Sequence, residues 1–219
     1  GFSGVFFLKP RRLDAWRVRV RALPQASRMP HDTKAAYPWA TSILLLVHPY
    51  VPFSPRERVS AYYIASNAAY QKSKSFLAAL QGEGPRFERA EIPLRALALA
   101  EGVGVQGRNG LLRIAPYGSR VVLQAVATDA CAPERYDDPL WLPCPDGCHA
   151  CMDACPTGAI SPGGLDVTRC MRLYMESLPY PPLAYQAMKT HMGCEVCQFA
   201  CPFNAPVGVR EVPEAVQQA

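Results

Sequence analysis

The stretch CPDGCHACMDACPTGAI, residues 144–160, places four cysteines within twelve positions and follows the last of them with proline. A second stretch, GCEVCQFACPFN, residues 193–204, holds three more cysteines and also has proline directly after its last one. The chain has 219 residues and nine cysteines, eight of which lie after residue 140. What these thiols bind therefore decides the fold of the C-terminal part of the chain.

Three kinds of site use cysteines in such numbers. Disulfide scaffolds are typical of short secreted chains, but this chain is 49% hydrophobic and shows no secretory leader or apolar run of membrane-spanning length. Zinc sites favour two separated Cys-x-x-Cys knuckles. Here both stretches contain Cys-x-x-Cys-x-x-x-Cys-Pro, which is typical of a ferredoxin with two [4Fe–4S] clusters. We therefore expect a cytoplasmic iron–sulfur protein without a membrane partner.

The spacing also predicts which thiols share a cluster. A Cys-x-x-Cys turn directs both thiolates at one cluster, whereas the third cysteine points away and reaches the other cluster. The expected ligands of the first cluster are Cys144, Cys148, Cys151 and Cys201. The expected ligands of the second cluster are Cys155, Cys170, Cys194 and Cys197.

One interval departs from the usual pattern. Three residues separate Cys144 from Cys148, where two are usual, and Pro145 and Gly147 suggest a loop that still delivers the thiolate. Cys131 is left without a role in this scheme. It is either a substitute ligand or a free thiol that packs as a small apolar side chain.

Charge is distributed unevenly along the chain. The net charge is +5, from 23 basic and 18 acidic residues, and the excess lies entirely within residues 1–30. Residues 11–23 alternate arginine with apolar residues, which predicts a strand with a solvated face. A nucleic-acid surface is one interpretation, but a basic edge strand that resists aggregation accounts for the same pattern, and we prefer it.

The residues before the cysteines predict strands and helices in mixed order. Apolar runs at 4–8 and 41–47 predict buried strands, and 86–92 a further strand. Capping signals predict helices over about 55–80 and 93–102. The segments 111–115 and 119–128 flank a turn and predict a hairpin. The predicted class is α+β, with an α/β domain over residues 1–130 and a double [4Fe–4S] ferredoxin-like domain over 131–219.

Several longer segments are similar to a known family. AEGVGVQGRNGLLRIAPYGSRVVLQAVATDA, residues 100–130, followed by ACPTGAI, TRCM and GCEVCQFACPFN, resembles the epoxyqueuosine reductases and their shorter relatives, the double-cluster ferredoxin proteins. These families are related to the corrinoid-dependent reductive dehalogenases. The resemblance implies a nitroreductase-like α/β domain that binds a corrinoid (cobalamin), with two [4Fe–4S] clusters supplying its electrons.

The resemblance also implies where the corrinoid would bind. Glycines allow a backbone to approach a flat cofactor closely, although a helix C-cap followed by a tight turn accounts for the same glycines. The candidate corrinoid-binding residues are Gly102, Gly104, Gly107, Arg108, Asn109 and Tyr117.

Two departures from the family shape the functional expectation. The family's catalytic aspartate has no counterpart in FERAEIPLRAL, residues 87–97, so Glu91 and Tyr70 are the candidate catalytic proton donors. The chain ends fifteen residues after Asn204, without the family's C-terminal helical repeats. We therefore expect an oxidoreductase that is not an epoxyqueuosine reductase and does not act on tRNA.

The expected partners are a small-molecule substrate of unknown identity or a corrinoid, and a redox protein that donates electrons. Two alternatives stay open from the sequence. One is an electron-transfer or corrinoid-reducing protein without a substrate of its own, and the other is a flavin-dependent reductase.

Overall fold

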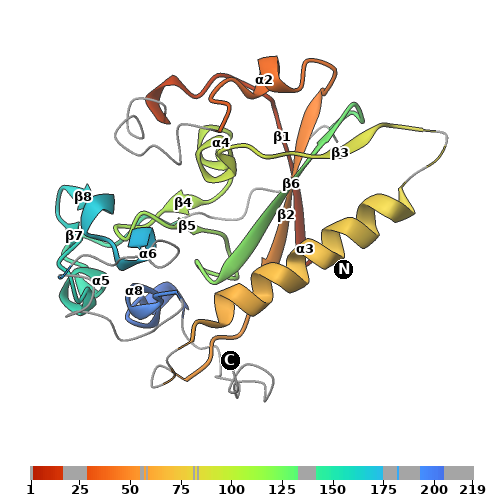
Figure 1. Ribbon diagram of the computed structural model, residues 1–219. Coiled ribbons are helices and arrows are strands. Elements are labelled where there is room, and N and C mark those ends of the chain that lie inside the picture. Colours follow the sequence, from red (N-terminus) through yellow and green to blue (C-terminus); the bar gives the residue numbers. More distant parts are fainter. Residues whose placement is uncertain are drawn as a thin grey trace. The chain divides into compact units, whose positions relative to one another are not determined.

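The chain forms two compact units that alternate along the sequence (Figure 1). The computed structural model describes residues 2–16, 29–54, 57, 59–80, 82, 84–132, 142–174, 182 and 193–204. The first unit comprises Gly1–His48, Asn67–Gly104 and Val122–Leu140. The second comprises Pro49–Ser66, Val105–Val121 and Trp141–Ala219. Two segments from the first 130 residues thus group with the cysteine-rich part, while a domain boundary at residue 130 stays a prediction.

The first unit is built on a four-stranded sheet. Its strand order is β1 (Gly4–Leu8), β2 (Ser42–Pro49), β6 (Val121–Thr128) and β3 (Phe87–Arg89). β1 runs antiparallel to β2, with Phe6 opposite Leu45, and β3 runs antiparallel to β6, with Glu88 opposite Ala127. The predicted strands at 4–8 and 41–47 are therefore confirmed, and within the predicted strand at 86–92 only residues 87–89 form one.

Apolar side chains on both faces of β2 explain why helices cover this sheet. Residues 42–47 of β2 are all buried. On one face Leu44, Leu46 and Val126 form a core against which Phe76 and Leu77 of α3 (Ala61–Ala79) pack. The short helix α4 (Leu94–Ala100) lies on the other side of the sheet and buries its apolar side chains (Figure 1). Burial on two faces is what a near-continuous apolar strand requires.

The predicted start of the long helix differs from the structure. The long helix begins at Ala61 and not near residue 55, because the Ser60 hydroxyl accepts a hydrogen bond from the Tyr62 amide (3.1 Å). The Ser54 carbonyl instead closes a turn by accepting from the Glu57 amide (2.9 Å).

The predicted hairpin of 111–115 with 119–128 is wrong. β5 (Leu112–Arg113) pairs with β4 (Val105–Gln106), while β6 joins the large sheet. The PYG turn is closed locally by a bridge between Ile114 and Gly118. This isolated bridge does not extend into a ladder between β5 and β6.

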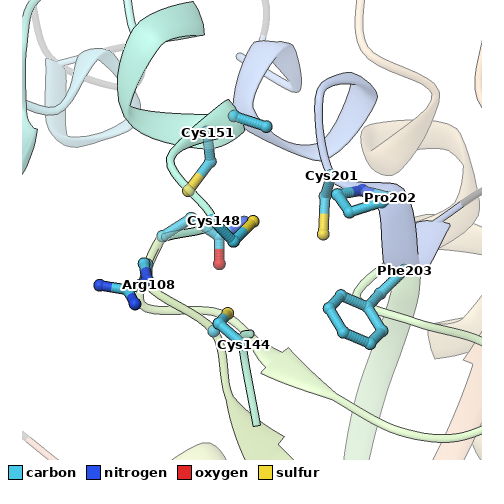
Figure 2. A pocket seen from close by; sticks show the side chains of 10 residues that line it. Arg108, Cys144, Cys148, Cys151, Cys201, Pro202 and Phe203 are labelled. Atoms are coloured by element: carbon cyan, nitrogen blue, oxygen red, sulfur yellow. The ribbon is translucent and has the colours of Figure 1, made fainter. Parts of the chain in front are cut away.

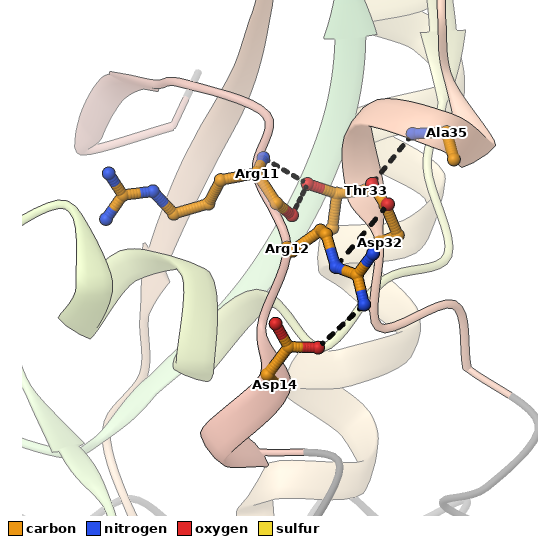
Figure 3. Close-up of polar contacts among 6 residues, drawn as sticks. All are labelled: Arg11, Arg12, Asp14, Asp32, Thr33 and Ala35. Carbon is orange, nitrogen blue, oxygen red and sulfur yellow. Dashed lines mark hydrogen bonds and ion pairs between the residues drawn. The ribbon is translucent and has the colours of Figure 1, made fainter.

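Residues 11–14 of the basic N-terminal segment contact the start of α2 (Thr33–Ala36) through hydrogen bonds and ion pairs, as Figure 3 shows. The Arg11 amide donates to the Thr33 hydroxyl (2.8 Å). Arg12 forms ion pairs with Asp14 (3.2 Å) and Asp32 (4.0 Å). Residues 17–28, which hold most of the predicted basic strand, lie outside the described residues.

The described elements of the second unit are short. They are β4, β5, α5 (Ala150–Ala154), β7 (Ile160–Ser161), β8 (Gly164–Leu165), η2 (Val167–Arg169), α6 (Met171–Tyr174), α8 (Val196–Phe199) and η3 (Pro202–Asn204). α5 packs against α8, so the two cysteine-rich stretches lie side by side. The mixed helix and sheet class is confirmed. Among the described residues, no helix has the length and apolar character that crossing a bilayer demands.

Candidate iron–sulfur centres

Four thiols from two distant stretches surround one pocket in the second unit. Figure 2 shows the side chains of Cys144, Cys148, Cys151 and Cys201 directed at a common space. Cys201 is some fifty residues from the other three in sequence. The pocket is completed by residues that carry no thiol: Gly107, Arg108, Asn109, Ala150, Pro202 and Phe203.

A tight turn accommodates the unusual interval between Cys144 and Cys148. The Cys148 amide donates to the Pro145 carbonyl (3.1 Å), which closes a four-residue turn. Gly147 occupies its third position with φ +75, a value that favours glycine in a type II turn. A Cβ at Gly147 would meet no atom within 4 Å, so this glycine is required for its backbone conformation and not for space. The extra residue thus still delivers the Cys144 thiol to the pocket.

The electrostatics of Cys151 confirm that these thiols are neighbours. Burial raises the pKa of the Cys151 thiol, and the nearby Cys144 and Cys201 thiols raise it further. A buried thiol among other thiols resists ionisation unless a cation is present to stabilise the thiolate. An iron centre would supply that charge.

The remaining four cysteines of the predicted scheme form a second neighbourhood. Burial raises the pKa of Cys194, and the nearby Cys170 and Cys155 thiols add to the shift. Burial, with Cys194 and Cys170 as neighbours, raises the pKa of Cys197 to about 12. Cys155 therefore lies with this group, although it directly follows the helix that carries Cys151. Cys151 also acts on Cys197, so the two neighbourhoods adjoin. The assignment of the eight thiols to two clusters stays a prediction.

Cys155 is held differently from its partners. Burial opposes its ionisation, but hydrogen bonds from the Thr157 hydroxyl and from backbone amides outweigh that effect and lower its pKa. One of these is the Ala159 amide, whose nitrogen lies 3.3 Å from Sγ. Amide donors around a cysteine sulfur are typical of cluster ligands.

The donor set fits a cluster better than a single ion. Zinc holds each sulfur at about 2.3 Å, which places the sulfurs only roughly 4 Å apart. Among the described residues, no three His, Cys, Asp or Glu side chains are grouped closely enough to hold one metal ion. In addition, the Arg108 Nε beside the first pocket is buried without a hydrogen-bond partner in the described structure. A wide, anionic, sulfur-rich group would satisfy both observations.

The residues predicted to bind a corrinoid are divided between the two units. Gly102 and Gly104 belong to the first unit, whereas Gly107, Arg108 and Asn109 line the first thiol pocket. A Cβ at Gly107 would lie 2.7 Å from the Asn109 Oδ1, so this glycine makes room for a buried amide. The Asn109 side chain also hydrogen-bonds to the Cys197 thiol. Asn109 therefore lines the pocket of the first group and bonds to a thiol of the second.

Tyr117, the last of the predicted corrinoid residues, lies in the PYG turn. Its amide donates to the Ile114 carbonyl (2.7 Å), and its side chain is partly exposed. It belongs to the second unit, like Asn109. A role for it in cofactor binding stays a prediction.

The two candidate proton donors both contact Arg89 in the first unit. The Glu91 carboxylate lies 3.7 Å from the Arg89 guanidinium and is 80% exposed. It also lines a cavity of about 530 Å³, together with Ile92, Leu123 and Gln124. Tyr70 instead packs its ring against that guanidinium (4.5 Å) and is absent from the cavity lining. Of the two, Glu91 is the group that a ligand in this cavity could reach.

A buried polar network was missed from the sequence. The Tyr50 hydroxyl donates a short hydrogen bond to the Glu195 carboxylate, and the Gln198 amide donates to the same hydroxyl (3.5 Å). Burial raises the pKa of Tyr50, and the Glu195 charge adds to this effect. Two buried arginines stack on phenylalanine rings nearby: Arg113 on Phe203 and Arg120 on Phe199. No spacing or periodicity marks these residues, because they come from four separate segments.

Cys131 is the cysteine left out of the predicted scheme of eight ligands. Its thiol is exposed, so the interpretation of a half-buried thiol that packs as an apolar side chain is wrong. By contacts it belongs to the first unit, whereas the eight other cysteines belong to the second.

Comparison with known proteins places these features in a family context. Residues 144–204 match the model of the 4Fe-4S double cluster binding domain. The epoxyqueuosine reductase of Bacillus subtilis is 32% identical over 120 residues, which cover 53% of this chain and 30% of that protein. The epoxyqueuosine reductase of Leadbetterella byssophila is 28% identical over 228 residues, which cover 94% of this chain and 74% of that protein.

Solved structures share the fold. A structure of the epoxyqueuosine reductase from Bacillus subtilis superimposes with a TM-score of 0.71 at 24% identity, covering 98% of this chain and 64% of that one. A crystal structure of epoxyqueuosine reductase with an epoxyqueuosine-modified tRNA stem loop gives a TM-score of 0.67 at 23% identity, covering 93% of this chain and 62% of that one.

These relatives overturn two expectations. The expected function, with an unknown substrate or with electron transfer alone, is wrong because the curated relatives are named for one reaction. The expectation of no action on tRNA is contradicted by the same names and by the structure with a tRNA stem loop. Both expectations relied in part on where the chain ends, and the expectation of an unknown substrate relied also on the missing aspartate. In its matches to several relatives the chain spans only about a third of their length (30% to 34%), so its end does not bear on substrate.

The relatives are reductases, which supports the prediction of an oxidoreductase and removes the ground for excluding epoxyqueuosine reductase activity. A link to the reductive dehalogenases stays a prediction. Residues 144–204 are thus similar to a 4Fe-4S double cluster binding domain, and the predicted resemblance of this chain to the epoxyqueuosine reductases is confirmed.

Proposed function

We propose that this protein is an iron–sulfur oxidoreductase of the epoxyqueuosine reductase type, which reduces the epoxide of epoxyqueuosine in tRNA. The observation that carries the proposal is the pair of four-thiol groups in a chain whose curated relatives bear that name. The thiol groups alone are not sufficient, because double-cluster domains serve many reactions. The name of the relatives alone is not sufficient either, because it does not identify the electron carriers of this chain.

Two clusters match the electron demand of this reaction. Removal of an epoxide oxygen consumes two electrons and two protons: both C–O bonds break, the two carbons form a double bond, and the oxygen leaves as water. Each [4Fe–4S] cluster carries one electron, so a chain with both clusters can hold two electrons supplied by an external donor. The first cluster would be bound by Cys144, Cys148, Cys151 and Cys201, and the second by Cys155, Cys170, Cys194 and Cys197.

Glu91 is the group that we propose as proton donor. Its carboxylate lines a cavity whose volume, about 530 Å³, lies in the range of small-molecule sites. Arg89 beside it can hold the carboxylate in place or accept a developing negative charge. Tyr70 would act through Arg89 and not on the substrate, because its ring stacks on that guanidinium.

A corrinoid and a nitroreductase-like first domain are the finer parts of this proposal, supported by the family resemblance. The candidate corrinoid residues are divided between the two units, and three of them border the thiol pocket. No step of the proposed reaction is therefore derived through a corrinoid.

The test is turnover of a defined substrate under anaerobic conditions. The reconstituted protein, reduced with dithionite, is incubated with a tRNA stem loop that carries epoxyqueuosine, with and without added cobalamin. We expect loss of the epoxide oxygen, which mass spectrometry of the nucleosides detects. Glu91→Gln should lower the rate by about a hundredfold while leaving the iron content unchanged.

The control substrate is the same stem loop without the modification, and the control variant is Glu88→Gln, on the strand next to the cavity. A protein with both clusters reduced that leaves the modified stem loop intact, with and without cobalamin, would refute the proposed function.

A further inference from the structure

Arg120 is a buried cation next to the first group of thiols. Its side chain is 5% exposed. Burial lowers its pKa, and the nearby Glu195, Tyr50 and Cys201 groups act in the opposite direction. Arginine keeps its charge in proteins because its ordinary pKa exceeds 12. The second unit therefore holds a permanent positive charge close to Cys201.

This guanidinium also holds the segment that contains Cys201. Nη1 donates to the Asn204 carbonyl (3.0 Å) and Nη2 to the Gln198 carbonyl (3.4 Å), one on each side of the cysteine. The guanidinium carbon lies 4.8 Å from the centre of the Phe199 ring. Planar, two-pronged donation of this kind fixes geometry in a way that a lysine cannot reproduce.

The residues before Arg120 hold the same segment from its other end. The Ser119 amide donates to the Asn204 Oδ1 (2.7 Å), and the Asn204 Nδ2 donates to the Gln198 carbonyl (2.9 Å). Gly118 leaves the space that Asn204 fills, since a Cβ there would lie 2.2 Å from Oδ1. Residues 118–120 thus fix the position of a cysteine that lies eighty residues further along the chain.

The two groups of thiols have different charged neighbours. Arg108 lines the first pocket, and Arg120 acts on Cys201. Near the second group, the Glu195 carboxylate acts on Cys194 and Arg172 acts on Cys170. Two described cations thus lie beside the first group, while Glu195 acts both on Cys194 and on Arg120.

We propose that Arg120 is a positioning residue that fixes Cys201 as the crossing ligand and raises the reduction potential of the cluster held by Cys144, Cys148, Cys151 and Cys201. Reduction adds one negative charge to a cluster, and a fixed cation in a medium of low dielectric constant stabilises the reduced form. The first cluster is then the better electron acceptor, and electrons pass to it from the second. This inference rests on the cluster assignment of the proposed function but not on its substrate.

The test is a redox titration of the anaerobic full chain without tRNA, in which electron paramagnetic resonance monitors each cluster. Arg120→Met removes the charge but keeps a long side chain, and we expect the midpoint potential of the first cluster alone to fall. Arg120→Lys keeps the charge and should keep that midpoint near the native value. Arg172→Met is the matched control, because it removes a cation beside the second group and should lower only the second midpoint.

Equal shifts in Arg120→Met and Arg120→Lys would refute the role of charge, and unchanged midpoints or equal shifts of both clusters in Arg120→Met would refute the proposal. If Arg120→Met loses the iron of the first cluster alone, the positioning role is supported. In that case the midpoint potential of the first cluster is measured in Glu195→Gln, which tests the role of charge while Arg120 is kept. Removal of the neighbouring acid should raise the first midpoint, and an unchanged midpoint would overturn the inference.

These outcomes are separable from failure of the proposed function. A protein with less than about eight irons would contradict the cluster assignment itself. A protein with the expected potentials that does not reduce epoxyqueuosine would contradict the proposed substrate and leave the role of Arg120 intact.

Discussion

The two units of this molecule are held together by different means. In the first unit an eight-residue apolar strand, β2, is covered on both faces, and the core consists of Leu44, Leu46 and Val126 with aromatic neighbours. In the second unit the described helices and strands near the thiols have two to five residues. Its interior contains a hydrogen-bonded network around Arg120 and Asn204.

The difference shows how a small unit can be stable with little regular structure. Short elements bury little apolar surface, so a metal centre or a dense polar network must supply the missing stabilisation. The sheet unit needs neither, because burial of its apolar side chains is sufficient. The two units should therefore respond to different perturbations.

Removal of iron should have the largest effect and should be confined to the second unit. When the clusters are extracted anaerobically with a chelator, we expect the amides around Cys151 and Cys201 to lose hydrogen-exchange protection because their ligands are no longer bridged. The amides of β2 and β6 should stay protected. Loss of protection in both units together would show that the sheet also depends on the clusters.

Single ligand replacements should remove one cluster each and reveal the crossover. Cys201→Ser should abolish the cluster of Cys148 and Cys151, and Cys155→Ser that of Cys194 and Cys197, so each variant keeps about four irons. Electron paramagnetic resonance with iron analysis distinguishes the two. Cys131→Ser is the control and should keep all the iron. Loss of the cluster nearest in sequence would contradict the crossover.

A cavity in the sheet core should destabilise the first unit without affecting iron. Leu46 is fully buried next to Val126, so Leu46→Ala removes packed side-chain atoms and should cost about 3 kcal/mol of unfolding free energy. Chemical denaturation followed by tryptophan fluorescence measures this loss. The iron content of the folded variant should match the native protein, and a fall in iron would show that the units are coupled.

Two glycines of similar backbone conformation provide a finer comparison. Gly118 (φ +65) faces Asn204, whereas Gly102 (φ +75) has no atom within 4 Å of an added Cβ. Gly102→Ala should cost about 1 kcal/mol from backbone strain alone. Gly118→Ala should cost about 2 kcal/mol or more and weaken retention of the first cluster, because Asn204 must move. Equal costs would show that Asn204 does not need the space.

An exposed ion pair should matter least. Arg12 is 61% exposed and its partner Asp14 is 64% exposed, and such pairs contribute little to stability because water screens the charges. Arg12→Ala should leave the melting temperature unchanged within error in differential scanning calorimetry. A large fall would show that Arg12, which also pairs with Asp32 at the start of α2, stabilises this region more than its exposure suggests.

Some of these features could be predicted from the sequence and others could not. The strand at residues 42–49 was predictable because a short, continuous apolar run is typical of a strand that is buried on both faces. The hairpin of 111–115 with 119–128 was not, because the pairing of β5 with β4 and of β6 with β3 depends on distant partners. Likewise the start of α3 at Ala61 depends on a hydroxyl at Ser60, although Ser54 offers the same chemistry.

The site divides in the same way. The grouping of Cys155 with Cys170 and Cys194, and of Cys201 with Cys151, follows from spacing because a short turn fixes the directions of nearby thiols. The position of Asn109, at the first pocket and bonded to Cys197, does not follow from spacing. In the sequence this residue is one polar residue in a glycine-rich segment, and only the fold brings it to the thiols.

The sequence by itself determined the number of thiols, their division into two groups and the apolar strand of the sheet, since each follows from local spacing or from a run of side chains of one kind. The tertiary structure decided which remote residues fix those thiols. Arg120 and Gly118 meet Cys201 and Asn204 across eighty residues, and contacts between such distant positions arise only when the whole chain has packed.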